Sequence, residues 1–219
     1  MTRLVAAICV LLASVPAAAQ NAPRLPWFAI DVHAATVGIP QAEGWVPALG
    51  TTTDYPGRNF GLSGGVTVYP FKLGLITLGI GATVSSAKAT AETTVITGSG
   101  ATQTITVTQV VRTGVTNLIP QVSLNFGRRL GWSYISGGMG RTKVKSRADA
   151  IGTKPEIVVP EAWNQTINFG GGAKWFPKPH LGAGFDIRFV KLGSRSPTDV
   201  LASAKRTQQW TISAGISVQ

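Results

Sequence analysis

Apolar side chains alternate with polar or small side chains along eight separate segments of the chain. In segment 74–86, for example, Ile76, Leu78 and Ile80 share one parity, and threonine, serine and glycine occupy the other. A period of two predicts a β-strand that turns one face toward an apolar medium and the other toward a polar or crowded space. The predicted strands are 27–37, 60–70, 74–86, 116–127, 131–142, 163–176, 180–191 and 207–218.

The segment 131–142 follows this alternation less clearly than the other seven. Ile135 and Met139 lie on one parity, whereas Trp132 and Tyr134 lie on the other. Large side chains therefore occupy both faces, and the pattern leaves open which face of this strand is turned inward.

The links between the eight segments alternate in length. The predicted short turns are 70–73, 128–130 and 177–179, and the predicted long links are 38–59, 87–115, 143–162 and 192–206. Outer-membrane barrels have short periplasmic turns and longer outer loops. The pattern predicts an all-β fold: a closed, antiparallel, up-and-down transmembrane β-barrel of about eight strands, with both chain ends on the periplasmic side.

Residues 1–19 have the three parts of a secretory signal peptide. Arg3 supplies the positive start, an apolar core covers 4–15, and an Ala-Ala-Ala sequence at 17–19 predicts cleavage before Gln20. We therefore expect residues 20–219 to form the exported barrel domain. The single cysteine, Cys9, lies within the signal peptide, so we expect neither a disulfide nor a cysteine-based metal site in the exported domain.

The composition favours a membrane barrel over a soluble domain. Charged residues make up only 13% of the chain and hydrophobic residues 44%, whereas about a quarter of the residues in a typical soluble domain are charged. After the signal peptide no apolar run reaches the roughly 18 residues that a helical span requires. Because a bilayer admits only helices and closed barrels, we expect strands to cross it, in a bacterial outer membrane of the Gram-negative type.

The chain is strongly basic, with a formal net charge of +11. Such a balance is common in nucleic-acid-binding proteins, but export and the scatter of the basic residues argue against that partner. Many of these residues fall near the predicted outer ends of the strands, where the phosphates of outer-leaflet glycolipids would suit them. Simple solubility is the alternative explanation. These basic residues are Lys88, Arg112, Arg141, Lys143, Lys145, Arg147, Arg195, Lys205 and Arg206.

Two sets of side chains follow from the predicted faces. Eight strands enclose an interior that side chains fill, so we expect a polar plug in which Arg188 bridges Asp186 and, as a further option, Asp31. The complete predicted interior network is Asp31, His33, Gln121, Asn125, Asn168, Lys174, Asp186 and Arg188. The predicted aromatic girdle at the periplasmic membrane surface is Tyr69, Phe71, Phe126, Trp132, Trp175 and Phe176.

The segment Asn168–Phe176, its turn, and the segment Phe185–Phe189 resemble the sixth and seventh strands of the small eight-stranded outer-membrane β-barrel family. The resemblance implies an integral membrane protein that is inserted by the barrel assembly machinery, and we expect a monomer. Such barrels usually end in an aromatic residue, whereas this chain ends in Ser217-Val218-Gln219.

Catalytic chemistry is not expected. Some barrels of this kind hydrolyse lipids with an outward histidine and a serine two residues later, but neither His33 nor His180 has that serine. Asp31 and His33 share a face that points into the barrel, away from substrate. Neither a phosphate-binding glycine loop nor a metal-ligand cluster is present, so no cofactor and no metal is predicted.

The link 87–115 is the least usual segment, because two arms rich in threonine and valine flank Gly98-Ser99-Gly100. They predict a hairpin that extends beyond the membrane and offers an exposed edge for adhesion or a partner; a merely solvated extension is the alternative. The sequence thus indicates an outer-membrane, cell-surface barrel with a structural, surface-interaction or membrane-integrity role. A narrow, porin-like channel for small or apolar solutes and a soluble lipocalin-like binder are the alternatives.

Overall fold

The computed structural model describes residues 25–38, 45, 58–73, 76–100, 103–150, 156–197 and 203–219, and for 58, 93–100 and 103–109 it describes only the backbone. The predicted signal peptide and its cleavage site lie outside the described residues. Within them, no helix is long and apolar enough to cross a membrane.

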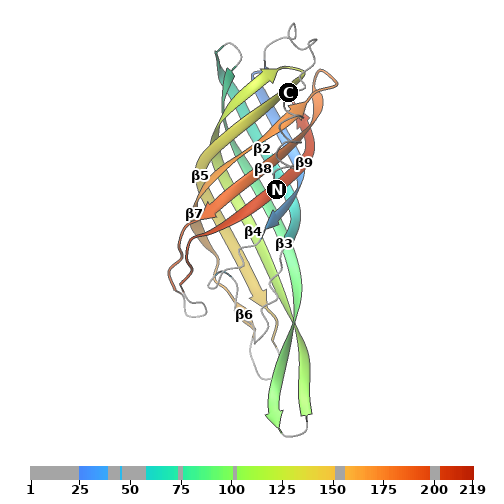
Figure 1. Cartoon of the computed structure of the whole chain (residues 1–219), viewed down its shortest axis with the longest axis vertical. Helices are drawn as coiled ribbons and strands as arrows, with labels where there is room; N and C mark the ends of the chain where they lie inside the picture. Colours follow the sequence, from blue (N-terminus) through green and yellow to red (C-terminus); the bar gives the residue numbers. More distant parts are fainter. Residues whose placement is uncertain are drawn as a thin grey trace, which may run out of the picture.

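The described chain forms a closed antiparallel β-barrel (Figure 1), as the alternation of side chains predicts. Strands that follow one another in sequence pair side by side, and pairing of β1 with β9 closes the ring. The short strand β6 stands outside the ring and pairs only with the end of β5. The strands are β1 (Phe28–Gly38), β2 (Arg58–Leu73), β3 (Ile76–Gly100), β4 (Gln103–Arg128), β5 (Gly131–Ala148), β6 (Ile157–Val158), β7 (Ala162–Trp175), β8 (Leu181–Leu192) and β9 (Thr207–Val218).

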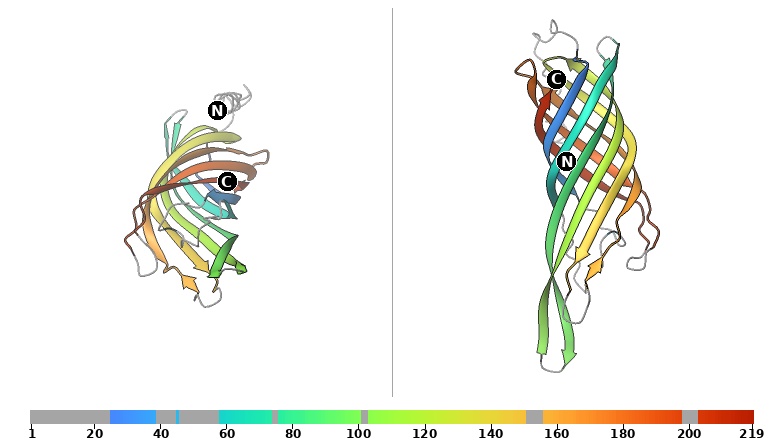
Figure 2. Two further views of the ribbon diagram at one scale, coloured as in Figure 1. Left: turned by 60° about the horizontal axis from the view of Figure 1, so that its bottom comes forward. Right: turned by 180° about the vertical axis from the view of Figure 1, so that it is seen from behind.

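The two ends of the barrel differ. The close connections β2–β3, β4–β5 and β7–β8 lie at the end that is uppermost in Figure 1, where the C-terminus also lies. At the opposite end β3 and β4 continue far past the neighbouring strands as a two-stranded ribbon, which Figure 1 and the right view of Figure 2 show leaving the barrel wall. We call these the turn end and the hairpin end.

Three strands extend well past the predicted membrane-crossing segments, and two of them, β3 and β4, do so as the predicted hairpin. The predicted long link 87–115 is strand over most of its length, because β3 runs to Gly100 and β4 starts at Gln103. Likewise β5 continues to Ala148, so the predicted link 143–162 is shorter than expected. The arms of β3 and β4 are rich in Thr, Val and Ile, which favour continued strand on a paired ribbon. In the extension of β5, Lys143, Val144 and Lys145 continue the alternation of polar and apolar side chains.

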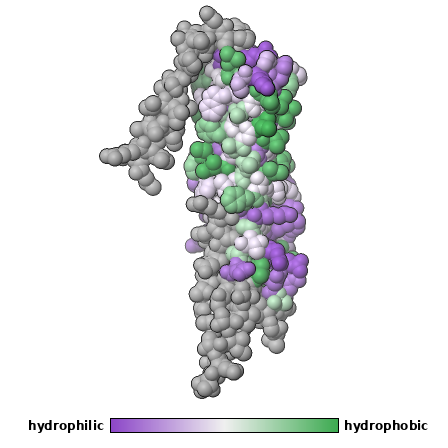
Figure 3. Space-filling view, turned by 90° about the vertical axis from the view of Figure 1, so that its right-hand side faces the viewer, coloured by the Kyte–Doolittle hydropathy of each residue, from purple (hydrophilic) through white to green (hydrophobic). Residues whose placement is uncertain are grey.

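The two faces of the wall carry opposite chemistry. Large apolar side chains such as Val32, Leu62 and Ile216 are between 57 and 65% exposed on the outside, whereas serines, threonines and asparagines of the opposite parity are buried inside. Figure 3 shows hydrophobic side chains gathered on the upper part of the wall and hydrophilic ones toward the hairpin end. A soluble lipocalin-like binder requires the reverse arrangement, so the structure disfavours that alternative.

The pairing of β5 with β4 and β7 decides the orientation that its sequence leaves open. Ile135 and Met139 face outward and are 57% and 73% exposed. Trp132 therefore faces the interior, where it is buried, and Tyr134 packs on the same inner side. The twofold alternation holds along β5, but the largest apolar side chain of the strand lies on its inner face.

Candidate functional site

The middle of the barrel interior holds two ion pairs. The Lys174 ammonium lies 2.6 Å from a carboxylate oxygen of Asp31, and the Ser217 hydroxyl donates to the other oxygen of that carboxylate at 2.6 Å. One guanidinium nitrogen of Arg188 lies 2.9 Å from Asp186. Buried charges require such partners, and here two cations match two carboxylates.

Arg188 is the centre of the second ion pair. It donates to Asp186 through Nε at 3.0 Å and through a terminal nitrogen at 2.9 Å. Its other terminal nitrogen donates to the side-chain oxygens of Gln121 and of Asn168, the latter at 3.0 Å. Asp31, the second partner that the sequence predicts for Arg188, pairs with Lys174 instead. The planar five-donor guanidinium suits this role, because one side chain can connect three strands.

Tyr134 and a glycine complete the surroundings of Asp186. The Tyr134 hydroxyl donates to the Asp186 carboxylate at 2.7 Å. A methyl group built on Gly172 would come within 2.9 Å of that hydroxyl oxygen and 3.0 Å of the Asp186 Cα atom. The triple glycine of β7 thus makes room for the network at this position, which is the close packing expected of glycine in a strand.

The remaining predicted interior residues also point inward but form separate contacts. The His33 ring lies 3.3 Å from the Ser213 hydroxyl, and Asn125 donates to Ser123 and to the Thr77 carbonyl. A further belt that the sequence reading did not single out lies nearer the hairpin end. There Asn117 accepts from Thr142 at 2.6 Å and from Gln209 at 3.0 Å.

The predicted aromatic girdle is divided between the two faces of the wall. Phe71, Phe126 and Trp175 are exposed on the outside. For the other three the prediction is wrong, because they pack inside the turn end: Trp132 stacks on Phe176 with ring centroids 5.0 Å apart and meets Tyr69 edge to face at 5.9 Å. Phe176 follows the outward Trp175 and so takes the opposite face, whereas Tyr69 and Phe71 have the same parity and part because the register of β2 shifts between Val68 and Phe71. Together the three buried rings fill the interior at this end.

Toward the hairpin end the interior also holds an apolar cluster, which the alternation of side chains does not predict. Val37, Val115, Ile119 and Val190 form a buried cluster there. Trp45, from the predicted link 38–59, completes it: its side chain is fully buried, and its indole nitrogen donates to the Lys205 carbonyl at 3.2 Å. The polar plug therefore occupies only the middle of the barrel, between an aromatic layer and an aliphatic one.

The ribbon at the hairpin end has two free backbone edges. β2 pairs with β3 only as far as Lys88, and β5 pairs with β4 only from Val111 onward. Between those points and the tip, β3 and β4 pair with each other, and their outer edges have no strand partner among the described residues. Free N–H and C=O groups along an edge can accept another strand.

No catalytic arrangement is apparent in the described part of the chain. His33 contacts Ser213 inside the barrel, and His180 contacts the Gln219 carbonyl at 3.1 Å. No group of three or more His, Cys, Asp or Glu side chains is placed to hold a metal ion among these residues. The interior thus has the character of a packed core with buried ion pairs.

The geometry defines the class of the protein as a closed, eight-stranded antiparallel β-barrel. No protein-family model matches the sequence, and no curated protein matches it. Among solved structures, this chain is similar to the outer membrane protease OmpT from Escherichia coli, with a TM-score of 0.48 at 7% identity. The similarity covers 74% of this chain and 64% of the OmpT chain, so this chain spans less than two thirds of that protein. Neisserial surface protein A has a TM-score of 0.45 at 11% identity, over 88% of this chain and 97% of its own. Ail of Yersinia pestis, solved with a heparin analogue, has a TM-score of 0.42 at 12% identity, over 87% and 96%.

Proposed function

We propose that this chain is an integral outer-membrane barrel that does not conduct solutes and that acts through its outer surface. The observation that carries the proposal is the filled interior. An aromatic layer closes the turn end, two ion pairs occupy the middle, and an aliphatic cluster with Trp45 occupies the hairpin end. With the interior occupied, interaction takes place at outer surfaces, which among the described residues include the wall and the hairpin.

The dimensions of the apolar wall support the membrane setting. Along β8 every outward residue from Leu181 to Phe189 is uncharged, and Lys191 is the first charge. At about 3.4 Å per residue and a tilt of about 40°, this stretch covers about 21 Å, near the apolar band of about 25 Å in known barrels. Lys72 near the turn end and Lys191 near the hairpin end then lie at the two membrane surfaces.

The closed interior predicts an absence of conductance. Purified protein inserted into planar lipid bilayers is expected to give no steady single-channel openings, because buried side chains of the three layers fill the described interior. Co-flotation of the protein with liposomes is the insertion control. Reproducible openings of one unit size would contradict the proposal and favour the alternative of a narrow channel.

We further propose that the surface interaction is adhesion through the hairpin ribbon. Two copies on facing cells meet head-on, so the β3 edge of one copy runs antiparallel to the β3 edge of the other. Antiparallel edges can form a backbone ladder, and pairing through the backbone requires little from individual side chains. The Thr- and Val-rich arms are of the composition that strands favour.

Cell–cell aggregation tests this role. Ala91 pairs with Val111 across the ribbon, so residues 92–110 can be replaced by Asn-Gly, a two-residue turn that closes antiparallel strands. Cells that display the full chain are expected to settle together, whereas cells that display the shortened chain stay in suspension. Ser99→Ala, a change at the tip that keeps both edges, is the control and should aggregate normally.

Two labelled cell populations show whether a second copy is the partner. Cells that display the barrel should exclude cells that lack it from the aggregates. Equal recruitment of both populations, or unchanged aggregation by the shortened chain, would overturn the proposed edge pairing.

A further inference from the structure

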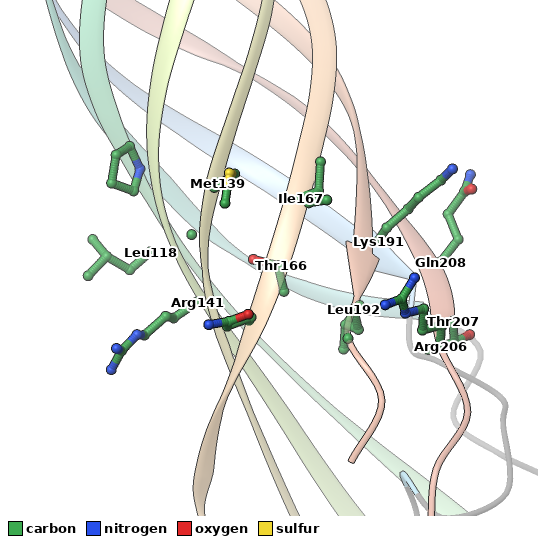
Figure 4. Close-up of a pocket in the computed structure, with 14 residues that line it drawn as sticks. Leu118, Met139, Arg141, Thr166, Ile167, Lys191, Leu192, Arg206, Thr207 and Gln208 are labelled. Carbon is green, nitrogen blue, oxygen red and sulfur yellow. The ribbon is translucent and has the colours of Figure 1, made fainter.

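A groove of about 770 Å³ crosses the outer wall near the hairpin end. It extends over β4, β5, β7 and β8 to the start of β9, and outward side chains form most of its lining. Leu118, Met139 and Ile167 give it an apolar floor. Figure 4 shows Arg141 on one side of this floor, and Lys191 with Arg206 on the opposite side.

These three cations differ from three other basic residues of the same end, which are paired with carboxylates. Lys143 lies 2.7 Å from a carboxylate oxygen of Glu161, Lys145 pairs with the same carboxylate, and Arg147 pairs with Glu156. Hydrogen bonds from the two lysines lower the pKa of the Glu161 carboxyl, so it stays charged beside them. No carboxylate in the described part of the chain lies within ion-pair distance of Arg141, Lys191 or Arg206.

The position of the groove along the barrel axis, relative to the proposed membrane surface, indicates what kind of anion would fit. Arg141 and Lys191 are the first charges that follow the uncharged outward stretches of β5 and β8. In the proposed membrane setting they lie where acyl chains end and headgroups begin. The floor below them faces acyl chains, and the cations face headgroups.

We propose that this groove binds a phosphorylated lipid of the outer leaflet, a proposal that rests on the membrane setting of the barrel. The phosphates contact Arg141, Lys191 and Arg206, and the acyl chains cover Met139 and Ile167. Guanidinium groups bind phosphate oxygens in pairs, and an ammonium contributes a point charge. A lipid fits better than a soluble anion, because a soluble anion would leave the apolar floor uncovered.

Two triple variants with the same loss of charge test the assignment. The groove variant is Arg141→Gln, Lys191→Gln and Arg206→Gln. The control variant is Lys143→Gln, Lys145→Gln and Arg147→Gln, which removes three cations of the same end that already have carboxylate partners. Each protein is placed in phosphatidylcholine nanodiscs doped with a bisphosphorylated glycolipid, and the glycolipid retained after detergent extraction is counted by native mass spectrometry.

The groove variant is expected to retain about tenfold less glycolipid than the unchanged protein, because each hydrogen bond from a cation to phosphate contributes strongly to affinity. The control variant should differ from the unchanged protein by less than about twofold, as expected for exposed paired charges. The dephosphorylated glycolipid should bind the unchanged protein as weakly as the phosphorylated one binds the groove variant. Faster migration of unheated samples in detergent gels verifies that both variants are folded.

Three results would overturn the inference. Equal losses in both variants would indicate diffuse attraction to basic charge, and equal retention of the dephosphorylated glycolipid would exclude phosphate recognition. Full displacement of the glycolipid by inorganic pyrophosphate would indicate a site for a soluble anion. If the protein instead failed to enter nanodiscs at all, the membrane setting itself would be wrong, so the two failures are distinguishable.

Discussion

Replacing Arg188 with alanine is expected to lower the free energy of unfolding by about 3–5 kcal/mol, the usual cost of removing one partner from a buried ion pair. The change leaves the Asp186 carboxylate buried without its cation and removes the donor that Gln121 and Asn168 accept from. Urea titration of the barrel in detergent micelles, followed by tryptophan fluorescence, measures the loss.

Arg112→Ala is the matched control for this prediction. Arg112 also binds a carboxylate, that of Asp149 at 2.7 Å, but its side chain is 54% exposed. Exposed pairs contribute at most about 1 kcal/mol, so this variant should unfold almost as the unchanged protein does. The double change Asp186→Asn with Arg188→Met removes both charges and should recover part of the loss. If Arg188→Ala were as stable as Arg112→Ala, the buried network would not stabilise the barrel.

Trp45→Ala is expected to cost a similar amount, about 3–5 kcal/mol, as large-to-small changes of buried aromatic side chains do. The Trp45 side chain is fully buried among Val37, Val115 and other members of the aliphatic cluster. Its removal leaves a cavity at the hairpin end and an unpaired Lys205 carbonyl. The same urea titration gives the change in unfolding free energy.

Trp45→Phe separates packing from hydrogen bonding in this case. Phenylalanine keeps most of the apolar volume but cannot donate to the Lys205 carbonyl. The loss of unfolding free energy should therefore fall to about 1 kcal/mol for the hydrogen bond, plus a small contribution from the reduced volume. A Trp45→Ala protein with unchanged stability would show that this side chain does not complete the core at the hairpin end.

Much of the barrel follows from local pattern. In β1, β2, β3, β8 and β9 the alternation by itself assigns the outward and inward faces that the structure has, because the two faces meet media of opposite polarity. The short turns at 128–130 and 177–179 are also evident from the sequence, whereas the turn predicted at 70–73 is wrong, because β2 continues to Leu73 and pairs with β3 there. The sequence also predicts the extended hairpin of β3 and β4, since its arms combine β-branched residues with a glycine-rich tip.

The girdle and β5 show where local pattern is insufficient. Trp132, Tyr69 and Phe176 sit close to short turns in the sequence, and that position favours a membrane-surface role. Proximity to a turn does not specify a face, however, and a large aromatic ring can fill the barrel interior as well as it can anchor in a headgroup layer. Only the pairing of β5 with both of its neighbours decides the side.

Local alternation specifies a strand barrel, the two faces of most of its strands, and the burial of charge inside. Tertiary structure alone decided which charges meet. Lys174 and Asp31 are 143 positions apart. This separation along the chain does not tell whether their two strands place the side chains at the same height inside the barrel. The same holds for Trp45 in the aliphatic cluster, and for Arg141, Lys191 and Arg206 around one groove. Such contacts depend on the relative shift of neighbouring strands, a property of the closed ring rather than of any single segment.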